Sequence, residues 1–248
     1  MPNIKLFLGI DDTDDAASRG TGYRARQLGK LLTDNKLAEL IAITRHQLLL
    51  HPRINYTSHN SSACLDLCVA QETYQACLEF CCEYISRTRV PTSDTGMCFA
   101  TQEDINGNIR HFGLQAKVKV MGKDEAQKLV GQEGIVLVKS MGTGEGIIGA
   151  LAAVGLRATG NDGRFIWLQG MRELTSSVYT PTELQQKANI YEVQNVDGVA
   201  VLPTAKILVG KWVRPILKEN HAVLLVHEVK DNEKFEWCTV PKETVQKY

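Results

Sequence analysis

Apolar and polar residues follow two different periods along the first half of the chain. Apolar residues run together at positions 4–10 and 40–44 and alternate with polar residues at 63–69, which predicts three strands. Positions 23–37 and 72–85 instead repeat every three to four residues, which predicts two amphipathic helices. The polar, irregular stretch at 48–62 predicts a loop.

The second half begins with helices and becomes rich in strand patterns. We expect helical pieces within 113–131, a short strand at 135–138 and an apolar helix at 147–156. Strand patterns then follow at 165–168, 190–193, 199–202, 206–209 and 223–229. Elements that alternate early and become strands late predict an α+β (mixed α/β) fold of two intimately packed α/β subdomains with a β-rich C-terminal tail.

Composition and charge indicate which binding partners and which cellular compartment to expect. The 248 residues carry 28 basic and 28 acidic side chains, so the chain lacks the basic surplus of proteins that hold RNA by its backbone. No apolar run of membrane-spanning length or signal-peptide pattern occurs, and the seven cysteines are an odd number. We expect a cytoplasmic protein with reduced thiols and no membrane partner; the sequence does not indicate its oligomeric state.

A cluster of carboxylates follows the first predicted strand. Asp11, Asp12 and Asp14 lie within four positions, and like charges this close favour a bound cation. Magnesium needs only one or two protein carboxylates when substrate phosphates complete its shell, so Asp11 and Asp12 are candidate metal ligands and Asp14 an assisting group. The alternative is a cluster of Asx turns and helix caps, and the residues themselves leave both interpretations open.

Thr21 immediately precedes the first predicted helix. Its hydroxyl is an obvious candidate for the N-cap. The same position also suits a phosphate at the positive end of the helix, or the hydroxyl itself as a nucleophile.

A second glycine-rich turn precedes the apolar helix. Residues 144–149 match G-x-G-x-x-G after a predicted strand, and Asp162 follows about 20 residues later, as in dinucleotide-binding proteins. However, Asp162 precedes the strand pattern at 165–168 instead of following it, which disfavours nicotinamide binding. Gly142, Gly144 and Gly146 can instead expose amides to an anion, or allow the helix to pack tightly on a sheet.

Together these residues resemble one known family. The segment Gly9-Ile10-Asp11-Asp12-Thr13-Asp14, the Thr21-x-Tyr23 helix start and the glycine turn running into Ala150-Leu151-Ala152-Ala153 are similar to archaeal isoleucine-tRNA agmatinylcytidine synthetase. Asn195-x-Asp197, Pro203 and Leu208-Val209-Gly210 resemble a later part of it, so the likeness extends over most of the chain.

The resemblance implies a fold and a set of roles. Residues 1–110 correspond to an ATP-binding kinase-like region, 111–200 to a ferredoxin-like region with the glycine turn, and 201–248 to a β-rich extension; we expect no counterpart here of the family's OB-fold and zinc ribbon. Asp11, Asp12, Asp14 and Thr21 would act in catalysis, with Thr21 matching a threonine that accepts a phosphoryl group. The residues expected at ATP are Thr13, Gly20, Gly22, His59, Asn60, Gly142, Gly144 and Gly146.

The resulting hypothesis is an ATP- and Mg²⁺-dependent enzyme that activates an acceptor by phosphoryl transfer, in the manner of a ligase. Residues 57–61 lack the Lys and Arg that the family carries there, and the net charge is zero, so a small-molecule acceptor is favoured over tRNA. The alternatives are a tRNA-modifying enzyme that acts with a partner protein and a non-catalytic nucleotide sensor.

Overall fold

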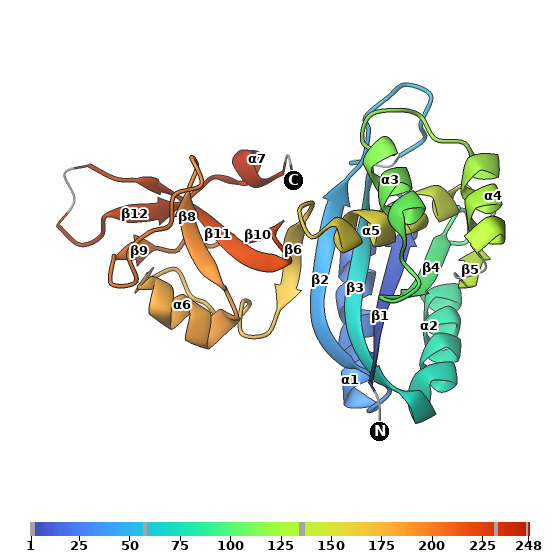
Figure 1. Ribbon diagram of the computed structural model, residues 1–248, viewed down its shortest axis with the longest axis horizontal. Helices are drawn as coiled ribbons and strands as arrows, with labels where there is room; N and C mark the ends of the chain where they lie inside the picture. Colours follow the sequence, from blue (N-terminus) through green and yellow to red (C-terminus); the bar gives the residue numbers. More distant parts are fainter. Residues whose placement is uncertain (1–2, 57–58, 134–136, 231–232, 247) are drawn as a thin grey trace. The chain divides into compact units, whose positions relative to one another are not determined.

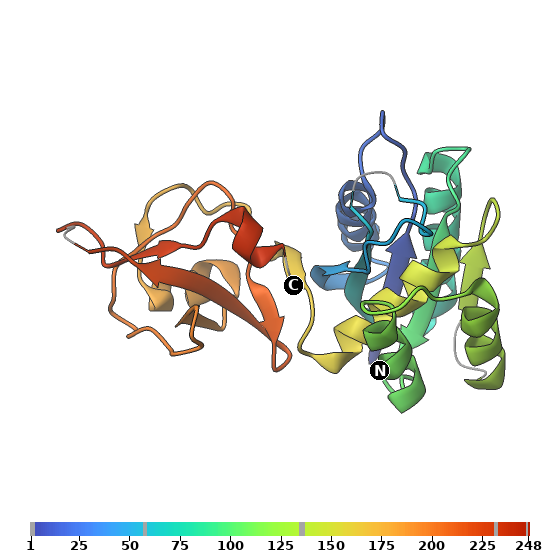
Figure 2. The same ribbon diagram turned by 90° about the horizontal axis from the view of Figure 1, so that it is seen from above.

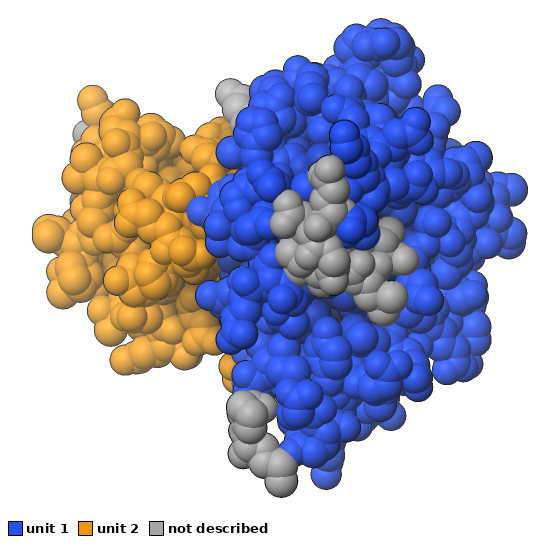
Figure 3. Space-filling model, turned by 45° about the vertical axis from the view of Figure 1, so that its right-hand side comes forward, with its two compact units in different colours: residues 1–159 blue, residues 160–248 orange. Residues whose placement is uncertain are grey.

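The computed structural model describes residues 3–56, 59–133, 137–230, 233–246 and 248. The chain forms two compact units, Met1–Thr159 and Gly160–Tyr248, which are coloured separately in Figure 3. The structure therefore divides the chain after residue 159, whereas the sequence suggested divisions at 110 and 200, and the roles assigned to those three regions stay predictions.

An antiparallel sheet forms the centre of the first unit. In the described residues its strand order is β5-β4-β1-β3-β2, and each neighbouring pair is antiparallel (Figure 1). The strands are β1 (Asn3–Asp11), β2 (Glu39–Gln47), β3 (Ser61–Ala70), β4 (Gly96–Thr101) and β5 (Leu137–Ser140).

Helices cover both faces of this sheet, as Figure 2 shows. One face packs against α1 (Thr21–Asp34) and α2 (Tyr74–Thr88), which follows the 3₁₀ turn η1 (Gln71–Thr73). The other face carries α3 (Gly107–Gln115), α4 (Lys123–Glu133) and α5 (Gly146–Thr159). A sheet buried on both sides explains why residues 6–10 are apolar without alternation.

The first 101 residues have a recognisable topology. The order β1-α1-β2-β3-α2-β4, with β1 between β3 and β4, is the split βαβ arrangement of ferredoxin-like folds. The resemblance led us to expect a ferredoxin-like region at 111–200, so the structure places this arrangement earlier in the chain.

The second unit is rich in strands. Its elements are β6 (Arg164–Leu168), β7 (Val178–Tyr179), α6 (Pro181–Ala188), β8 (Glu192–Asn195), β9 (Ile207–Leu208), β10 (Ile216–Lys218), β11 (His221–Glu228), β12 (Trp237–Thr239) and α7 (Lys242–Val245). They pair in the order β6-β10-β11-β12-β9-β7, with β8 parallel to β11. No helix in the described part of either unit is long and apolar enough to cross a membrane.

The mixed α/β class is confirmed, and so are both early helices within three residues at each end. The predicted strand at 199–202 is wrong: Val199 and Leu202 are exposed, and only Ala200 makes an isolated bridge to Gln194. Positions 135 and 136 of the predicted strand at 135–138 lie outside the described residues. Helix α6 was missed, although Thr180 and Glu183 form a capping box at its start.

Helix α5 packs against the sheet at backbone distance. Its residues 149–157 are all buried, in keeping with a helix that is apolar on every side. A Cβ on Gly9 of β1 would lie 2.0 Å from the Ala150 carbonyl oxygen, and one on Gly155 would lie 2.2 Å from the Ile109 carbonyl oxygen of α3. The glycines are therefore needed for this close approach.

We expect Gly9→Ala to destabilise the protein by about 3 kcal/mol, because its methyl group would overlap the backbone of α5. The matched control is Gly131→Ala in α4, where a Cβ meets nothing within 4 Å. That change should stabilise the helix by up to about 1 kcal/mol. Urea unfolding measures both, and equal stability of the two variants would contradict this packing.

A buried ion pair joins the other end of α5 to the same sheet face. The Arg157 guanidinium lies 2.5 Å from the Asp66 carboxylate of β3, and Lys5, whose side chain is 47% exposed, lies 3.8 Å from the same oxygen. Burial raises the pKa of Asp66 despite both cations. Because Asp66 Oδ1 and Arg157 Nε have no hydrogen-bond partner among the described residues, the pair depends on its single short contact.

Arg157→Met should lower the free energy of unfolding by about 3 kcal/mol, since it leaves the Asp66 carboxylate buried without its principal partner. Lys5→Met is the control and should cost less than about 1 kcal/mol, because that ammonium is half exposed. The double variant Asp66→Asn, Arg157→Met should regain part of the loss in the same unfolding assay. If the double variant loses as much unfolding free energy as the two single variants added together, Asp66 and Arg157 are not coupled.

Candidate functional site

The candidate site lies where β1 ends. Asp11, the last residue of β1, pairs with Gly96 at the start of β4. A Cβ on Gly96 would touch the backbone of Gly146, where α5 begins, and the loop after Asp11 leads into α1 at Thr21. Two helix N-termini, with their positive dipole ends, therefore lie near the acidic loop.

Asp11 projects toward the first turn of α5. A Cβ on Gly149 would lie 1.8 Å from its carboxylate, so a larger side chain there would displace Asp11. Burial, reinforced by the neighbouring charges of Asp12 and Asp14, raises the pKa of Asp11 to about 7. Without a bound cation, Asp11 therefore carries a proton for much of the time at neutral pH.

Asp12 adopts an unusual backbone conformation. Its φ angle of 48° is left-handed, which few residues other than glycine adopt, although aspartate does so more readily than most. The Thr95 hydroxyl donates to the Asp12 carbonyl at 2.8 Å, and the Asp94 amide donates to the Asp12 carboxylate at 3.2 Å. Burial raises the pKa of Asp12, and the charges of Asp94, Asp14 and Glu145 add to this effect.

Asp14 caps α1 and holds the Thr21 hydroxyl. One carboxylate oxygen accepts from the Thr21 amide at 3.0 Å and from its hydroxyl at 2.8 Å. Gly20 is the N-cap, so the expectation that Thr21 caps the helix is wrong: it is the first helical residue, and Asp14 supplies the cap.

Thr13 completes this group. Because Thr21 gives its proton to Asp14, the Thr13 hydroxyl must be the donor in its 3.0 Å bond to Thr21 Oγ1. The Thr13 amide also points to Thr21 Oγ1, at 3.3 Å. Thr13 is completely buried, and the Thr21 hydroxyl has a partner for its proton and for each lone pair.

Asp94 joins the acidic loop to the glycine turn. Its carboxylate accepts from the Thr143 amide at 2.6 Å, and its carbonyl accepts from the Gly146 amide at 2.9 Å. A Cβ on Gly142 would lie 2.3 Å from that carboxylate, and Gly142 and Gly144 both have positive φ angles. The two glycines thus let the turn fold around Asp94. Asp94 was not singled out from the sequence, although it lies in a polar stretch just before β4.

Basic residues flank the site on two sides. Lys123 of α4 donates to the Thr143 carbonyl at 2.6 Å, beside Gly144. Arg45 of β2 donates to the Ser61 hydroxyl at 2.8 Å; burial lowers its pKa, and the charges of Asp14 and Asp11 oppose that shift. Neither residue was singled out from the sequence, because each is distant from the acidic loop along the chain.

The remaining predicted residues lie around this edge. His59 is exposed, and its carbonyl accepts from Ser61, the residue that binds Arg45. Asn60 uses its side-chain amide to hold the Leu49 carbonyl at 2.7 Å. Gly22 is in the first turn of α1, one residue after Thr21.

The structure bears on the metal site and on the dinucleotide interpretation of the glycine turn. Across the described ranges, no three His, Cys, Asp or Glu side chains converge as a metal site, so a cation here would need further oxygen ligands from water or a substrate. The dinucleotide interpretation of the glycine turn is unsupported, because β5, the strand before the turn, pairs antiparallel with β4 instead of belonging to a parallel βαβ sheet.

The chain is similar in structure to several solved structures of one enzyme. The chain matches a complex of TiaS with its tRNA and ATP with a TM-score of 0.53 and 25% identity, over 61% of this chain and 36% of TiaS. TiaS is a tRNA agmatidine synthetase. This chain is structurally similar to TiaS.

Two further solved structures match the chain to a similar degree. A TiaS complex with tRNA, AMPCPP and agmatine matches with a TM-score of 0.52 and 25% identity, and a tRNA fluorescent labeling enzyme with 0.53 and 26%. Each match covers 61% of this chain and 36% of the other, so the chain spans about a third of the length of these structures. No family model and no curated protein sequence matches the chain.

The raised pKa of Asp11 predicts how stability depends on pH. The folded state holds the Asp11 proton up to about pH 7 and the unfolded state only to about pH 4, so ionisation costs stability as pH rises between these values. Asp11→Asn removes this cost. Its free energy of unfolding relative to that of wild type should therefore rise by up to about 4 kcal/mol as the pH increases from about 4 to about 8.

Urea unfolding at both ends of this pH range, without divalent cations, measures the difference. Asp15→Asn is the control, since Asp15 accepts from the Ala17 amide in an Asx turn that asparagine can also make. A pH-independent difference between Asp11→Asn and wild type would contradict the assigned pKa.

Proposed function

We propose that the first unit is an ATP- and Mg²⁺-dependent catalytic unit that activates an acceptor by phosphoryl transfer. The observation that carries this proposal is the pair of carboxylates Asp11 and Asp12, both with raised pKa, at the start of α5 and before α1. The match at 25% identity to a TiaS complex with ATP supports it.

The residues fit a bound magnesium ion. Carboxylate oxygens are the ligands that Mg²⁺ prefers, and raised pKa values mean that the negative charge of Asp11 and Asp12 is incompletely offset by the protein. We assign Asp11 and Asp12 as its ligands. When bound, Mg²⁺ supplies positive charge to the phosphates during transfer.

The glycine turn fits the phosphate groups. No hydrogen bond within the described residues reaches the amides of Gly144 and Glu145, while Asp94 holds those of Thr143 and Gly146. Lys123 adds a cation beside this turn. We therefore assign the Gly144 and Glu145 amides and Lys123 to phosphate oxygens.

The Thr21 hydroxyl has a carboxylate in place to take its proton. On phosphoryl transfer to Thr21, its oxygen forms the new bond to phosphorus, its proton passes to Asp14 and the bond to the ADP leaving group breaks. Because both lone pairs of Thr21 Oγ1 face donors, the Thr13 hydroxyl must turn away first. Asp14 thus acts as the base, and Thr13 as the residue that positions the hydroxyl.

The test is Mg²⁺-dependent ATP turnover by the purified chain. Asp11→Asn should lower the rate by about 100-fold, since it removes a ligand of the ion that neutralises the phosphates. Asp15→Asn, in the same loop, should turn over ATP like wild type. Mg²⁺ should also raise the melting temperature of wild type but not of Asp11→Asn. Equal turnover by wild type and Asp11→Asn would falsify the assignment.

A second candidate is modification of tRNA together with a partner protein. It is favoured by the similarity to TiaS, two of whose matched structures contain tRNA. Gel-shift of tRNA with the purified chain tests direct binding: tight, salt-sensitive retention would favour this candidate, and its absence would leave RNA recognition to the partner.

A further inference from the structure

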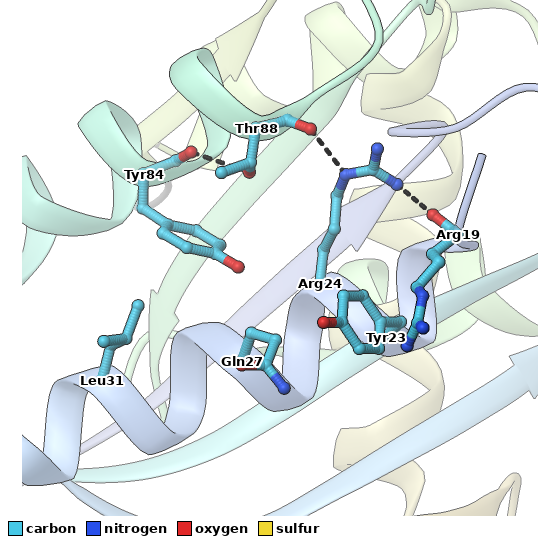
Figure 4. A pocket seen from close by; sticks show the side chains of 7 residues that line it. All are labelled: Arg19, Tyr23, Arg24, Gln27, Leu31, Tyr84 and Thr88. Atoms are coloured by element: carbon cyan, nitrogen blue, oxygen red, sulfur yellow. Dashed lines mark hydrogen bonds between the residues drawn. The ribbon is translucent and has the colours of Figure 1, made fainter.

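A cavity of about 390 Å³ lies between α1 and α2, apart from the acidic loop (Figure 4). Tyr23, Gln27 and Leu31 are spaced by four residues, so one side of α1 faces it. Tyr84 and Thr88 contribute the facing wall from α2. The volume suits a small organic molecule.

The lining is aromatic and positively charged. Figure 4 shows the rings of Tyr23 and Tyr84 on either side of Gln27. Arg19 lies over the Tyr23 ring, 4.5 Å from its centre. None of the seven lining residues, all within the described ranges, is acidic.

Arg24 brings a buried charge to this cavity. It is only 8% exposed, and its guanidinium donates to the Thr88 carbonyl at 2.8 Å and to the Arg19 carbonyl. These carbonyls orient the guanidinium but carry no full negative charge, so an anion from outside would complete its environment. The cavity therefore combines a cationic end with walls that carry two aromatic rings.

We propose that this cavity binds a small aromatic anion, a planar ring that carries a phosphate or a carboxylate. The anionic group lies at Arg19 and Arg24, and the ring packs against the tyrosines of the wall.

The probe is phenyl phosphate, compared with inorganic phosphate and with uncharged benzyl alcohol by calorimetry and ligand-observed NMR. Wild type should bind phenyl phosphate at least tenfold more tightly than either, since only it satisfies both ends of the cavity. Benzoate replaces phosphate by carboxylate and distinguishes the two anions. If phenyl phosphate binds no better than inorganic phosphate, the proposal fails.

The decisive variant is Arg19→Met, which alters an exposed side chain and so leaves the fold intact. It should weaken phenyl phosphate binding by about tenfold, the effect expected for one charge-assisted hydrogen bond. Lys30→Met, which removes an exposed charge elsewhere on α1, should bind like wild type. Equal weakening by both variants would mean that only net charge matters, and it would overturn the site.

Tyr84 tests the aromatic wall. Tyr84→Phe should retain binding and Tyr84→Leu should lose it; equal binding by the two would also overturn the proposal. Asp11→Asn should bind phenyl phosphate like wild type. If ATP turnover is absent while phenyl phosphate binds, the proposed function fails and the cavity assignment stands.

Discussion

The contact on which the candidate site depends is the backbone approach of α5 to the sheet. Gly9 and Gly96 on the strands and Gly146 and Gly149 at the start of the helix leave no room for a Cβ between them. This approach fixes the N-terminus of α5 beside Asp11 and draws the glycine turn around Asp94. The positions of the carboxylates therefore follow from packing, before any ligand is considered.

The electrostatics of the same helix differ at its two ends. Near its C-terminus, Arg157 offsets the buried Asp66 within the protein. Near its N-terminus, the helix dipole and the partly buried Arg45 do not keep the pKa of Asp11 at its ordinary value. The charge of Asp66 is thus offset by a side chain of the protein, whereas the charge of Asp11 is offset only in part.

The geometry also reassigns roles within the acidic loop. Asp14 accepts from both the amide and the hydroxyl of Thr21, so it caps α1 and has a different set of contacts from Asp11 and Asp12. Asp94, from a loop 82 residues after Asp12, holds that residue and the glycine turn together. Asp11, Asp12 and Asp14, which lie within four positions of the sequence, thus contact different parts of the folded unit.

The sequence by itself determined the strand before Asp11, the helix after Thr21 and the apolar helix after the glycine turn, because period and composition act locally. It also identified the acidic loop and the glycine turn as chemically unusual. The family resemblance placed these two segments at one site. Only the tertiary structure decided that Asp94, Arg45 and Lys123 lie beside them, and that α1 and α2 line a cationic, aromatic cavity. Such contacts link residues far apart in the chain, and strand order and helix packing fix them, neither of which a local pattern encodes.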